Sequence, residues 1–338
     1  MRSRLLTFNR QGSPARILMS FLRAFGAFVP ERIVTNQEIA DRIGKSPEWI
    51  QEVSGITERR WASSDVSVTD LAVHAAEDCL TRSGVQASAV GIVIVGSGTT
   101  ERRFPGPACV VAQRLGLAGI PAIDLPMASA GSLYGMALAS RLAGEFGNVL
   151  VIGADKMSAV VDREPADPNT AMLFGDGAGA CLISSHDGRL RIVDSVLHSD
   201  GSYAEDLRLG FDGPLEMNGM AVILNASRKI PGAIHEVLAR QGMAALDIER
   251  FVMHQANHNL IVRVAKSVGV PAERFYSNIG RYGNTSSASM LIAASECWMD
   301  ARSIGFAAFG AGFHWGALLA LASGMRDMEP PAPLRSRL

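Results

Sequence analysis

Charge of one sign is the first thing this sequence lacks. Its 32 Lys and Arg residues are balanced by 33 Asp and Glu residues, which leaves a formal net charge of -1 on 338 residues. A nucleic-acid-binding protein needs a surplus of basic groups to neutralise phosphates, so we expect no nucleic acid partner. The sequence also has no apolar run long enough to cross a bilayer, so we expect no membrane partner. Small molecules in the cytoplasm are the expected ligands.

Cysteine is scarce too, and the four cysteines are scattered without the CxxC or Cys/His spacings of metal sites and disulfide frameworks. We therefore expect no metal site and interpret the thiols as small apolar side chains of the core. The nucleophile motif GxSxG of lipases is absent as well, since the nearest candidate reads MASAG. The four residues are Cys79, Cys109, Cys181 and Cys297.

Aromatic residues make up only 6% of the chain, but hydrophobic residues reach 48%, enough for one large core or two fused ones. We predict an N-terminal half at 19–190 and a C-terminal half at 191–326. Residues 1–18 form a basic extension without the apolar core of a signal peptide, which leaves Met19 as an alternative start. Residues 327–338 are predicted to be a flexible tail.

The two halves repeat one order of elements, β-α-β-α-β-β, judged from apolar runs and helical spacing. A shift of roughly 150 residues carries the first set onto the second. The first set is VGIVIVGSG, PACVVAQRLGL, IPAIDL, GSLYGMALASRLA, NVLVIGAD and GAGACLISS; the second is ERFVMHQ, NLIVRVAKSVGV, RFYSNI, NTSSASMLIAASECW, GFAAFGAG and WGALLALAS. These patterns predict an α/β fold of duplicated halves with largely parallel sheets, whose loops at the carboxyl ends of strands converge on one site.

Ser129 occupies the first of these loops, in LPMASAGSLYG, between a strand and a helix of small residues. At the start of a helix, backbone N–H groups can stabilise a developing oxyanion, so Ser129 is a candidate nucleophile. Serine at such a place is also a common helix N-cap. Both interpretations stay open from the local sequence.

His254 in FVMHQANHN and Asn284 in GRYGNTSSAS lie on the corresponding loops of the second half. Either residue alone would be interpreted as a satisfied polar group. Together with Ser129 they form a possible nucleophile, base and orienting amide. The glycines of FGDGAGACLI lead into a strand, so they are interpreted as sites of close backbone approach between the halves and not as a dinucleotide loop.

These blocks together resemble the thiolase superfamily, specifically β-ketoacyl-acyl carrier protein synthase III, from about Leu22 to Ser323. The similarity rests on VPERIVTNQEIA, EWIQEVSGITERRWA, FPGPACVVAQRLG, MLFGDGAGA, FVMHQAN, GNTSSAS and FGAGFHWG. It implies duplicated βαβαβαββ halves in a five-layered α-β-α-β-α arrangement. It also implies a homodimer that uses acyl-coenzyme A, acyl carrier protein or another phosphopantetheine thioester as substrate, with no permanently bound cofactor.

The resemblance implies a Cys-His-Asn site in which the cysteine takes up an acyl group before condensation with a malonyl thioester. His254 and Asn284 match the histidine and the asparagine, but Ser129 stands where the family has its cysteine, in ASAG for ACAG. A thiol reaches its nucleophilic thiolate form far more readily than a serine hydroxyl, which must lose its proton during attack. The backbone N–H groups of Ser129 and Ala311 match the acyl oxyanion hole.

Three further residues match substrate-binding positions of the family: Trp49, Asn257 and Phe313. Two family arginines that help to hold phosphates are replaced, however, by Val53 and Asn259. These departures favour a specialised donor, such as an acyl chain on a carrier protein. Three other arginines have two possible interpretations: they supply positive charge near a tunnel mouth, or they are ordinary solvated arginines of the surface. They are Arg59, Arg60 and Arg263.

Three functions follow as hypotheses. The first is a serine-dependent acyltransferase of the synthase III type, in fatty-acid or specialised polyketide-type biosynthesis. The second is an enzyme in which His254 and Asn284 act alone, decarboxylating malonyl thioesters or catalysing direct acyl transfer. The third is a non-catalytic partner subunit of an active homologue.

Overall fold

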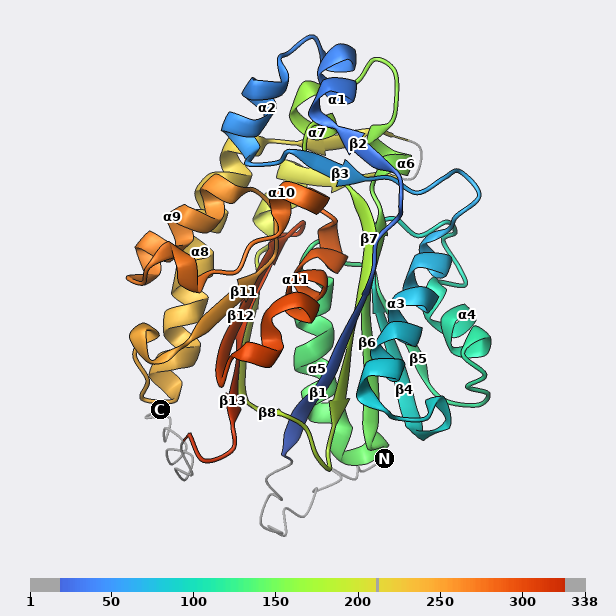
Figure 1. The fold of residues 1–338 in the computed structure, drawn as a ribbon, viewed down its shortest axis with the longest axis vertical. Helices are drawn as coiled ribbons and strands as arrows, with labels where there is room; N and C mark the ends of the chain where they lie inside the picture. Colours follow the sequence, from blue (N-terminus) through green and yellow to red (C-terminus); the bar gives the residue numbers. More distant parts are fainter. Residues whose placement is uncertain (1–18, 211–212, 326–338) are drawn as a thin grey trace, which may run out of the picture.

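The computed structural model describes residues 19–210 and 213–325, so the predictions for 1–18 and 327–338 lie outside the described residues. A nine-stranded mixed sheet runs through it in the order β11-β12-β13-β8-β1-β7-β6-β4-β5. Helices cover this sheet on its outer faces and fill the space where it folds back on itself (Figure 1). The predicted α/β class is confirmed.

The sheet contains two sets of strands that meet where β1 pairs with β8. The N-terminal set is β5 (Ala122–Leu125), β4 (Val90–Gly96), β6 (Asn148–Lys156), β7 (Asp176–Ser184) and β1 (Ser20–Phe28). The C-terminal set is β8 (Leu190–Ser199), β13 (His314–Ala322), β12 (Ser303–Gly310) and β11 (Arg250–Met253).

The duplication is visible in the pairing of these strands. In the first half β4 pairs parallel with β5 and β6, and β7 lies antiparallel between β6 and β1. In the second half β11 pairs parallel with β12, and β13 lies antiparallel between β12 and β8. Phe275 bridges β11 in parallel, at the place that β5 takes in the first half. The prediction of two like halves is therefore confirmed.

Two details of the predicted sheet were wrong. The sheet is not largely parallel, because β12 returns to β13 through a short turn without a crossover helix, and β6 and β7 are likewise antiparallel neighbours. RFYSNI also does not form a strand: Phe275 makes one isolated bridge, with its ring stacked on Phe251 at 4.7 Å. The following residues turn away into a polar network described below.

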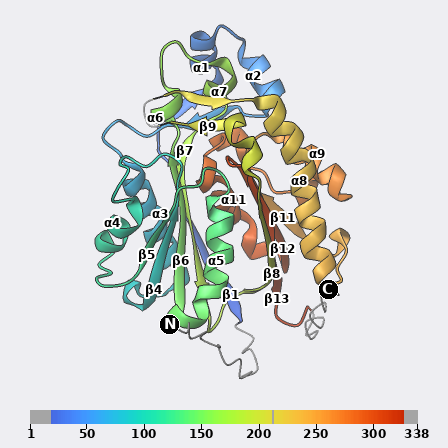
Figure 2. The same ribbon diagram turned by 180° about the vertical axis from the view of Figure 1, so that it is seen from behind.

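Figures 1 and 2 show the helices in three layers around the two sets of strands, which gives the predicted five-layered arrangement. One outer layer packs on the N-terminal strands and the other on the C-terminal strands, with the middle layer between them. The layers are α3 (Val68–Ser83) with α4 (Pro107–Arg114), α5 (Gly131–Phe146) with α11 (Ser289–Cys297), and α8 (Gly219–Arg240) with α9 (His258–Val268).

The middle layer explains the small residues of the sequence. Helix α11 is apolar or small on nearly all sides, as expected for a helix that is buried all round. A Cβ atom added at Gly179 of β7 would lie 2.5 Å from the Cβ of Leu291 in α11. The glycine thus permits the close approach of the halves that the sequence predicted.

Short elements close the end of the molecule at which the site lies, as both ribbon views show. They are β2 (Ile33–Thr35) with β3 (Glu58–Arg60), β9 (Leu207–Leu209) with β10 (Leu215–Met217), α1 (Asn36–Ile43), α2 (Pro47–Ser54), α6 (Ser158–Val161), α7 (Pro168–Ala171) and α10 (Ile279–Tyr282). Within the described ranges, no helix has the length and apolar character that a bilayer crossing requires.

Candidate active site

Ser129 lies in the tight turn between β5 and α5, where its backbone has a φ of 63°. The N-cap of α5 is the next residue, Ala130, and no side chain caps this helix. The alternative that Ser129 is an N-cap is therefore wrong. Left-handed backbone at a residue with a Cβ atom is strained, and residues of this kind cluster at functional sites.

His254 follows directly on β11, and its side chain is almost completely buried, with 4% exposed. Its Nδ1 lies 2.6 Å from the hydroxyl of Ser289, which also accepts the Gln255 N–H at 3.0 Å. Burial lowers the pKa of the imidazole to about 4, and a backbone hydrogen bond with Ser286 offsets only part of this effect. The ring is neutral at pH 7, and Ser289 holds it at Nδ1.

Asn284 is fixed through its backbone and through one end of its amide. Its N–H donates to the carbonyl of Leu173 at 2.8 Å, and its carbonyl accepts the Gly175 N–H at 3.1 Å. Its side-chain Oδ1 accepts the N–H of Ser286 at 2.9 Å. The amide nitrogen, a donor, is therefore the end presented to the neighbouring pocket.

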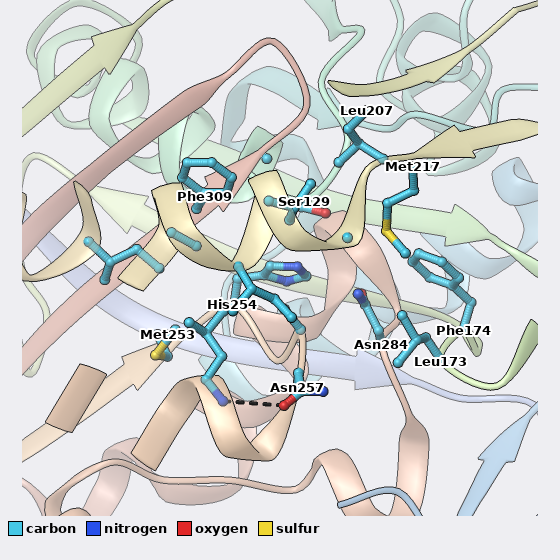
Figure 3. Close-up of a pocket in the computed structure, with 18 residues that line it drawn as sticks. Ser129, Leu173, Phe174, Leu207, Met217, Met253, His254, Asn257, Asn284 and Phe309 are labelled. Atoms are coloured by element: carbon cyan, nitrogen blue, oxygen red, sulfur yellow. Dashed lines mark hydrogen bonds between the residues drawn. The ribbon is translucent and has the colours of Figure 1, made fainter. Parts of the chain in front are cut away.

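Ser129, His254 and Asn284 line one pocket, which we call the His254 pocket. Figure 3 shows the three side chains around one space, with a turn of α8 passing over it. The remaining walls are mostly apolar, which keeps water away and strengthens polar interactions inside. These walls include Leu173, Phe174, Leu207, Met217, Val222, Ile223, Ala226, Ile230, Met253, Asn257, Leu260 and Phe309.

Ser129 also borders a second cavity, which we call the Ser286 cavity because Ser286 and Ala311 line it as well. The turn from 310 to 312 packs directly on the Ser129 turn: a Cβ atom added at Gly310 would lie 2.1 Å from the carbonyl oxygen of Ala128. The two backbones that the family resemblance assigns to an oxyanion hole thus lie side by side. The N–H of Ser129 itself donates to the hydroxyl of Ser286 at 3.0 Å.

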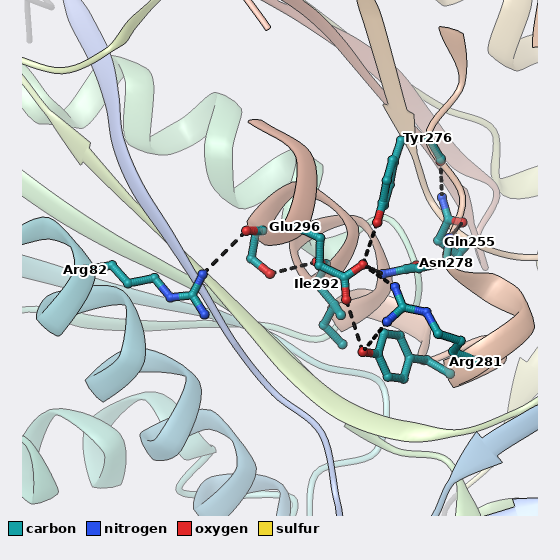
Figure 4. A network of polar contacts seen from close by, with 9 residues as sticks. Arg82, Gln255, Tyr276, Asn278, Arg281, Ile292 and Glu296 are labelled. Carbon is teal, nitrogen blue, oxygen red and sulfur yellow. Dashed lines mark hydrogen bonds and ion pairs between the residues drawn. The ribbon is translucent and has the colours of Figure 1, made fainter. Parts of the chain in front are cut away.

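A polar network holds the loop that leads to Asn284 (Figure 4). The carboxylate of Glu296 in α11 accepts the Tyr276 hydroxyl at 2.7 Å, the Arg281 guanidinium at 2.6 Å and the Tyr282 hydroxyl at 3.1 Å. The amide of Asn278 donates to it at 3.2 Å. Charge-assisted hydrogen bonds of this kind fix geometry more firmly than neutral ones.

Gln255 joins this loop to the loop of His254. Its amide nitrogen donates to the carbonyl of Tyr276 at 3.3 Å, and its oxygen accepts the N–H of Asn278 at 3.3 Å. The two candidate catalytic residues of the second half are therefore fixed relative to each other.

Arg59 was predicted at a tunnel mouth or on the solvated surface, and both alternatives are wrong. Its side chain is fully buried, and among the described residues no carboxylate lies within ion-pair distance of it. It donates to the Met172 carbonyl at 2.7 Å and to Oδ1 of Asn36 at 2.9 Å, and burial lowers its pKa to about 10. The neighbouring carbonyl, that of Leu173, is the one that accepts the N–H of Asn284.

Of the predicted substrate-binding residues, Asn257 lines the His254 pocket but already has partners. It is the N-cap of α9: its Oδ1 accepts the Leu260 N–H at 3.2 Å, and its amide donates to the Val53 carbonyl at 2.8 Å. Asn259 donates to the same carbonyl at 3.2 Å. The two positions that depart from the family thus lie in contact and tie α9 to α2.

Trp49 and Phe313 are not among the residues that line the His254 pocket. Trp49 is half-buried on α2, and the amine of Lys45 lies 5.4 Å from its ring centroid. Phe313 is fully buried between Tyr203 and Phe309, and it is Phe309 that reaches the pocket.

The sequence patterns therefore did not identify Phe309, Ser286 and Ser289 as residues of the site, and they placed Arg59 wrongly. FGAGF offered two phenylalanines without showing which one faced the ligand, and the serines were visible only as small helix residues.

Comparisons with known proteins show which family the chain belongs to. Residues 238–321 match the family profile described as 3-oxoacyl-[acyl-carrier-protein (ACP)] synthase III C terminal, and residues 123–201 match 3-oxoacyl-[acyl-carrier-protein (ACP)] synthase III. A β-ketoacyl-[acyl-carrier-protein] synthase III of Staphylococcus saprophyticus is 34% identical over 305 residues, covering 88% of this chain and 97% of that protein. The chain belongs to the 3-oxoacyl-[acyl-carrier-protein] synthase III family.

Several solved structures have a similar fold. That of the 3-oxoacyl-[acyl-carrier-protein] synthase III from Aquifex aeolicus VF5 matches with a TM-score of 0.85 and 32% identity, covering 89% of this chain and 99% of that chain. The priming β-ketosynthase from the R1128 polyketide biosynthetic pathway matches with a TM-score of 0.82 and 28% identity, covering 92% and 97%. The chain is thus an enzyme of the acyl-transferring, condensing kind.

Proposed function

We propose that the protein transfers an acyl group from a thioester to Ser129 and on to a malonyl thioester or another acceptor. The observation that supports this most directly is the position of Ser129, which borders both the His254 pocket and the Ser286 cavity. A covalent acyl group on its oxygen would extend into one space while the acceptor occupies the other. His254 and Asn284 would bind the carbonyl oxygen of the malonyl thioester and stabilise the enolate formed on loss of carbon dioxide.

Intact-protein mass spectrometry tests this proposal. Wild-type protein is incubated with a panel of acyl-coenzyme A and acyl-carrier thioesters, beside Ser129→Ala. We expect a mass increase equal to the acyl group in the wild type, mapped to the peptide of Ser129, and none at that peptide in the alanine variant. A wild type that takes up no acyl mass from any donor would refute a serine-bound intermediate.

A second candidate function is supported by the neutral state of His254. A pKa of about 4 makes the imidazole a weak general base for a serine hydroxyl, whereas a neutral N–H is a suitable donor to a thioester carbonyl. His254 and Asn284 would then decarboxylate malonyl thioesters, or promote direct acyl transfer, without Ser129. In that case Ser129→Ala keeps most of the decarboxylase turnover, measured as carbon dioxide release.

The donor is proposed to be an acyl chain on a carrier protein, in fatty-acid or polyketide-type biosynthesis. Support comes from the contact of Val53 with Asn257 and Asn259, which fills with neutral groups the place of the family's phosphate-binding arginines. We expect Asn259→Arg to lower the KM for acyl-coenzyme A donors more than the KM for acyl-carrier donors. Equal effects on both donors would contradict the assignment.

A homodimer is also proposed. Strand β5 is an edge of the nine-stranded sheet, and an unpaired edge is a template for a further strand. Ile123 on this strand is 38% exposed, and Phe104, in the segment before α4, is 84% exposed. Analytical ultracentrifugation of the wild type and Ile123→Lys is the test, with dissociation expected for the variant.

A further inference from the structure

Two strained serines, one of them the candidate nucleophile Ser129, are hydrogen-bonded to each other. In the ranges 19–210 and 213–325, Ser129 with a φ of 63° and Ser286 with a φ of 49° are the non-glycine residues with positive φ. Backbone of this kind is strained at a residue with a Cβ atom and persists only where its surroundings impose it. The N–H of the first donates to the hydroxyl oxygen of the second at 3.0 Å.

Fixed groups on both sides hold Ser286 in this conformation. Its own N–H donates to Oδ1 of Asn284 at 2.9 Å, and the N–H of the next residue, Ser287, donates to the buried carboxylate of Asp155 at 2.9 Å. The side chain of Ser286 is 1% exposed and lines the Ser286 cavity. Its hydroxyl is thus oriented before any substrate arrives, which is the condition for electrostatic stabilisation of a transition state.

The direction of this hydrogen bond changes the expected oxyanion hole. Because the Ser129 N–H already donates to Ser286, the hydroxyl proton of Ser286 is the donor left to the cavity that they share with Ala311. We propose that the Ser286 hydroxyl, together with the Ala311 N–H, binds the oxyanion formed when Ser129 attacks an acyl thioester. This inference rests on the proposed acyl transfer to Ser129 and assigns a further catalytic residue to it.

The step balances without a further reactant. The oxygen of Ser129 bonds to the thioester carbon, the carbonyl electron pair moves to the carbonyl oxygen, and the Ser129 proton passes transiently to the unprotonated ring nitrogen of His254, which is a weak base. The electron pair then returns, the C–S bond breaks, and the leaving thiolate takes up the proton from His254. Ser286 keeps its own proton throughout and shares it in a hydrogen bond, which the Ser129 N–H strengthens by polarising the hydroxyl.

Two variants separate this role from a structural one. Ser286→Ala removes the hydroxyl, and Ser286→Gly removes it while suiting the left-handed backbone, so the glycine variant should be at least as stable as the alanine variant. We expect both to acylate Ser129 about 10²- to 10³-fold more slowly than the wild type, the usual loss for one oxyanion donor. Ser295→Ala is the control, because its hydroxyl bonds to Ile292 of the same helix.

Acylation is followed by intact-protein mass spectrometry with the donor that labels the wild type fastest in the panel above. Malonyl thioester decarboxylation, measured as carbon dioxide release, should stay within about threefold of the wild type, because one donor of the acyl step is lost and the groups of the malonyl step remain. A Ser286→Gly variant that acylates at the wild-type rate would overturn the inference, as would an equal loss of both activities. If the wild type is never labelled, both this inference and the proposed function are overturned. If the wild type is labelled, the proposed function stands, and the results for the Ser286 variants decide this inference alone.

Discussion

Replacing His254 by asparagine should change how the stability of the protein depends on pH. Burial lowers the pKa of this histidine from 6.5 to about 4, so between these values the unfolded chain binds a proton here and the folded protein does not. The contribution of the neutral His254 to the free energy of unfolding is fully present above pH 6.5 and is lost as the pH falls toward 4. The shift corresponds to about 3 kcal/mol, because one pKa unit equals about 1.4 kcal/mol.

The assay is urea unfolding of the wild type and of His254→Asn at pH 7.5, 6.0 and 4.5. The wild type should lose about 2 to 3 kcal/mol more than the variant between the first and last pH, since carboxylates such as Asp70 titrate alike in both proteins. Parallel losses in the two proteins would refute the idea that a buried neutral imidazole sits in this pocket. Turnover that depends on the neutral ring should likewise persist down to about pH 5.

Three other substitutions have expected outcomes. Ser129→Cys should be acylated about tenfold faster or more, because a thiol ionises more readily, with labelling followed by mass spectrometry. Arg59→Met should lower the free energy of unfolding in urea by about 2 to 4 kcal/mol, since the Met172 carbonyl loses its donor. Arg60→Met, which breaks a partly exposed pair with Glu58, should lose less than about 1 kcal/mol. Glu296→Gln should lose about 1 to 2 kcal/mol and also slow decarboxylation, and unchanged decarboxylation would contradict its role in holding the Asn284 loop.

The sequence was sufficient to predict the duplicated fold and three converging loops, because strand and helix patterns depend on local apolar spacing. It could not decide between cap and nucleophile at Ser129, since that depends on a φ angle and on which residue begins α5. The burial of Arg59 was also invisible, because a buried cation is recognised only from the carbonyls that surround it. The sequence also could not show that Phe309 lines the pocket and Phe313 does not, because this depends on the turn between β12 and β13.

The pairing of β1 with both β7 and β8 has a consequence for how substrates reach Ser129. Since one hydrogen-bonded ladder crosses from the first half to the second, the halves cannot swing apart about a hinge without breaking strand pairs. The wall of the pocket formed by β9, β10 and the start of α8 supplies Leu207, Met217 and Val222. With the halves joined in this way, we expect reactants to reach Ser129 past these three side chains and not through a cleft between the halves.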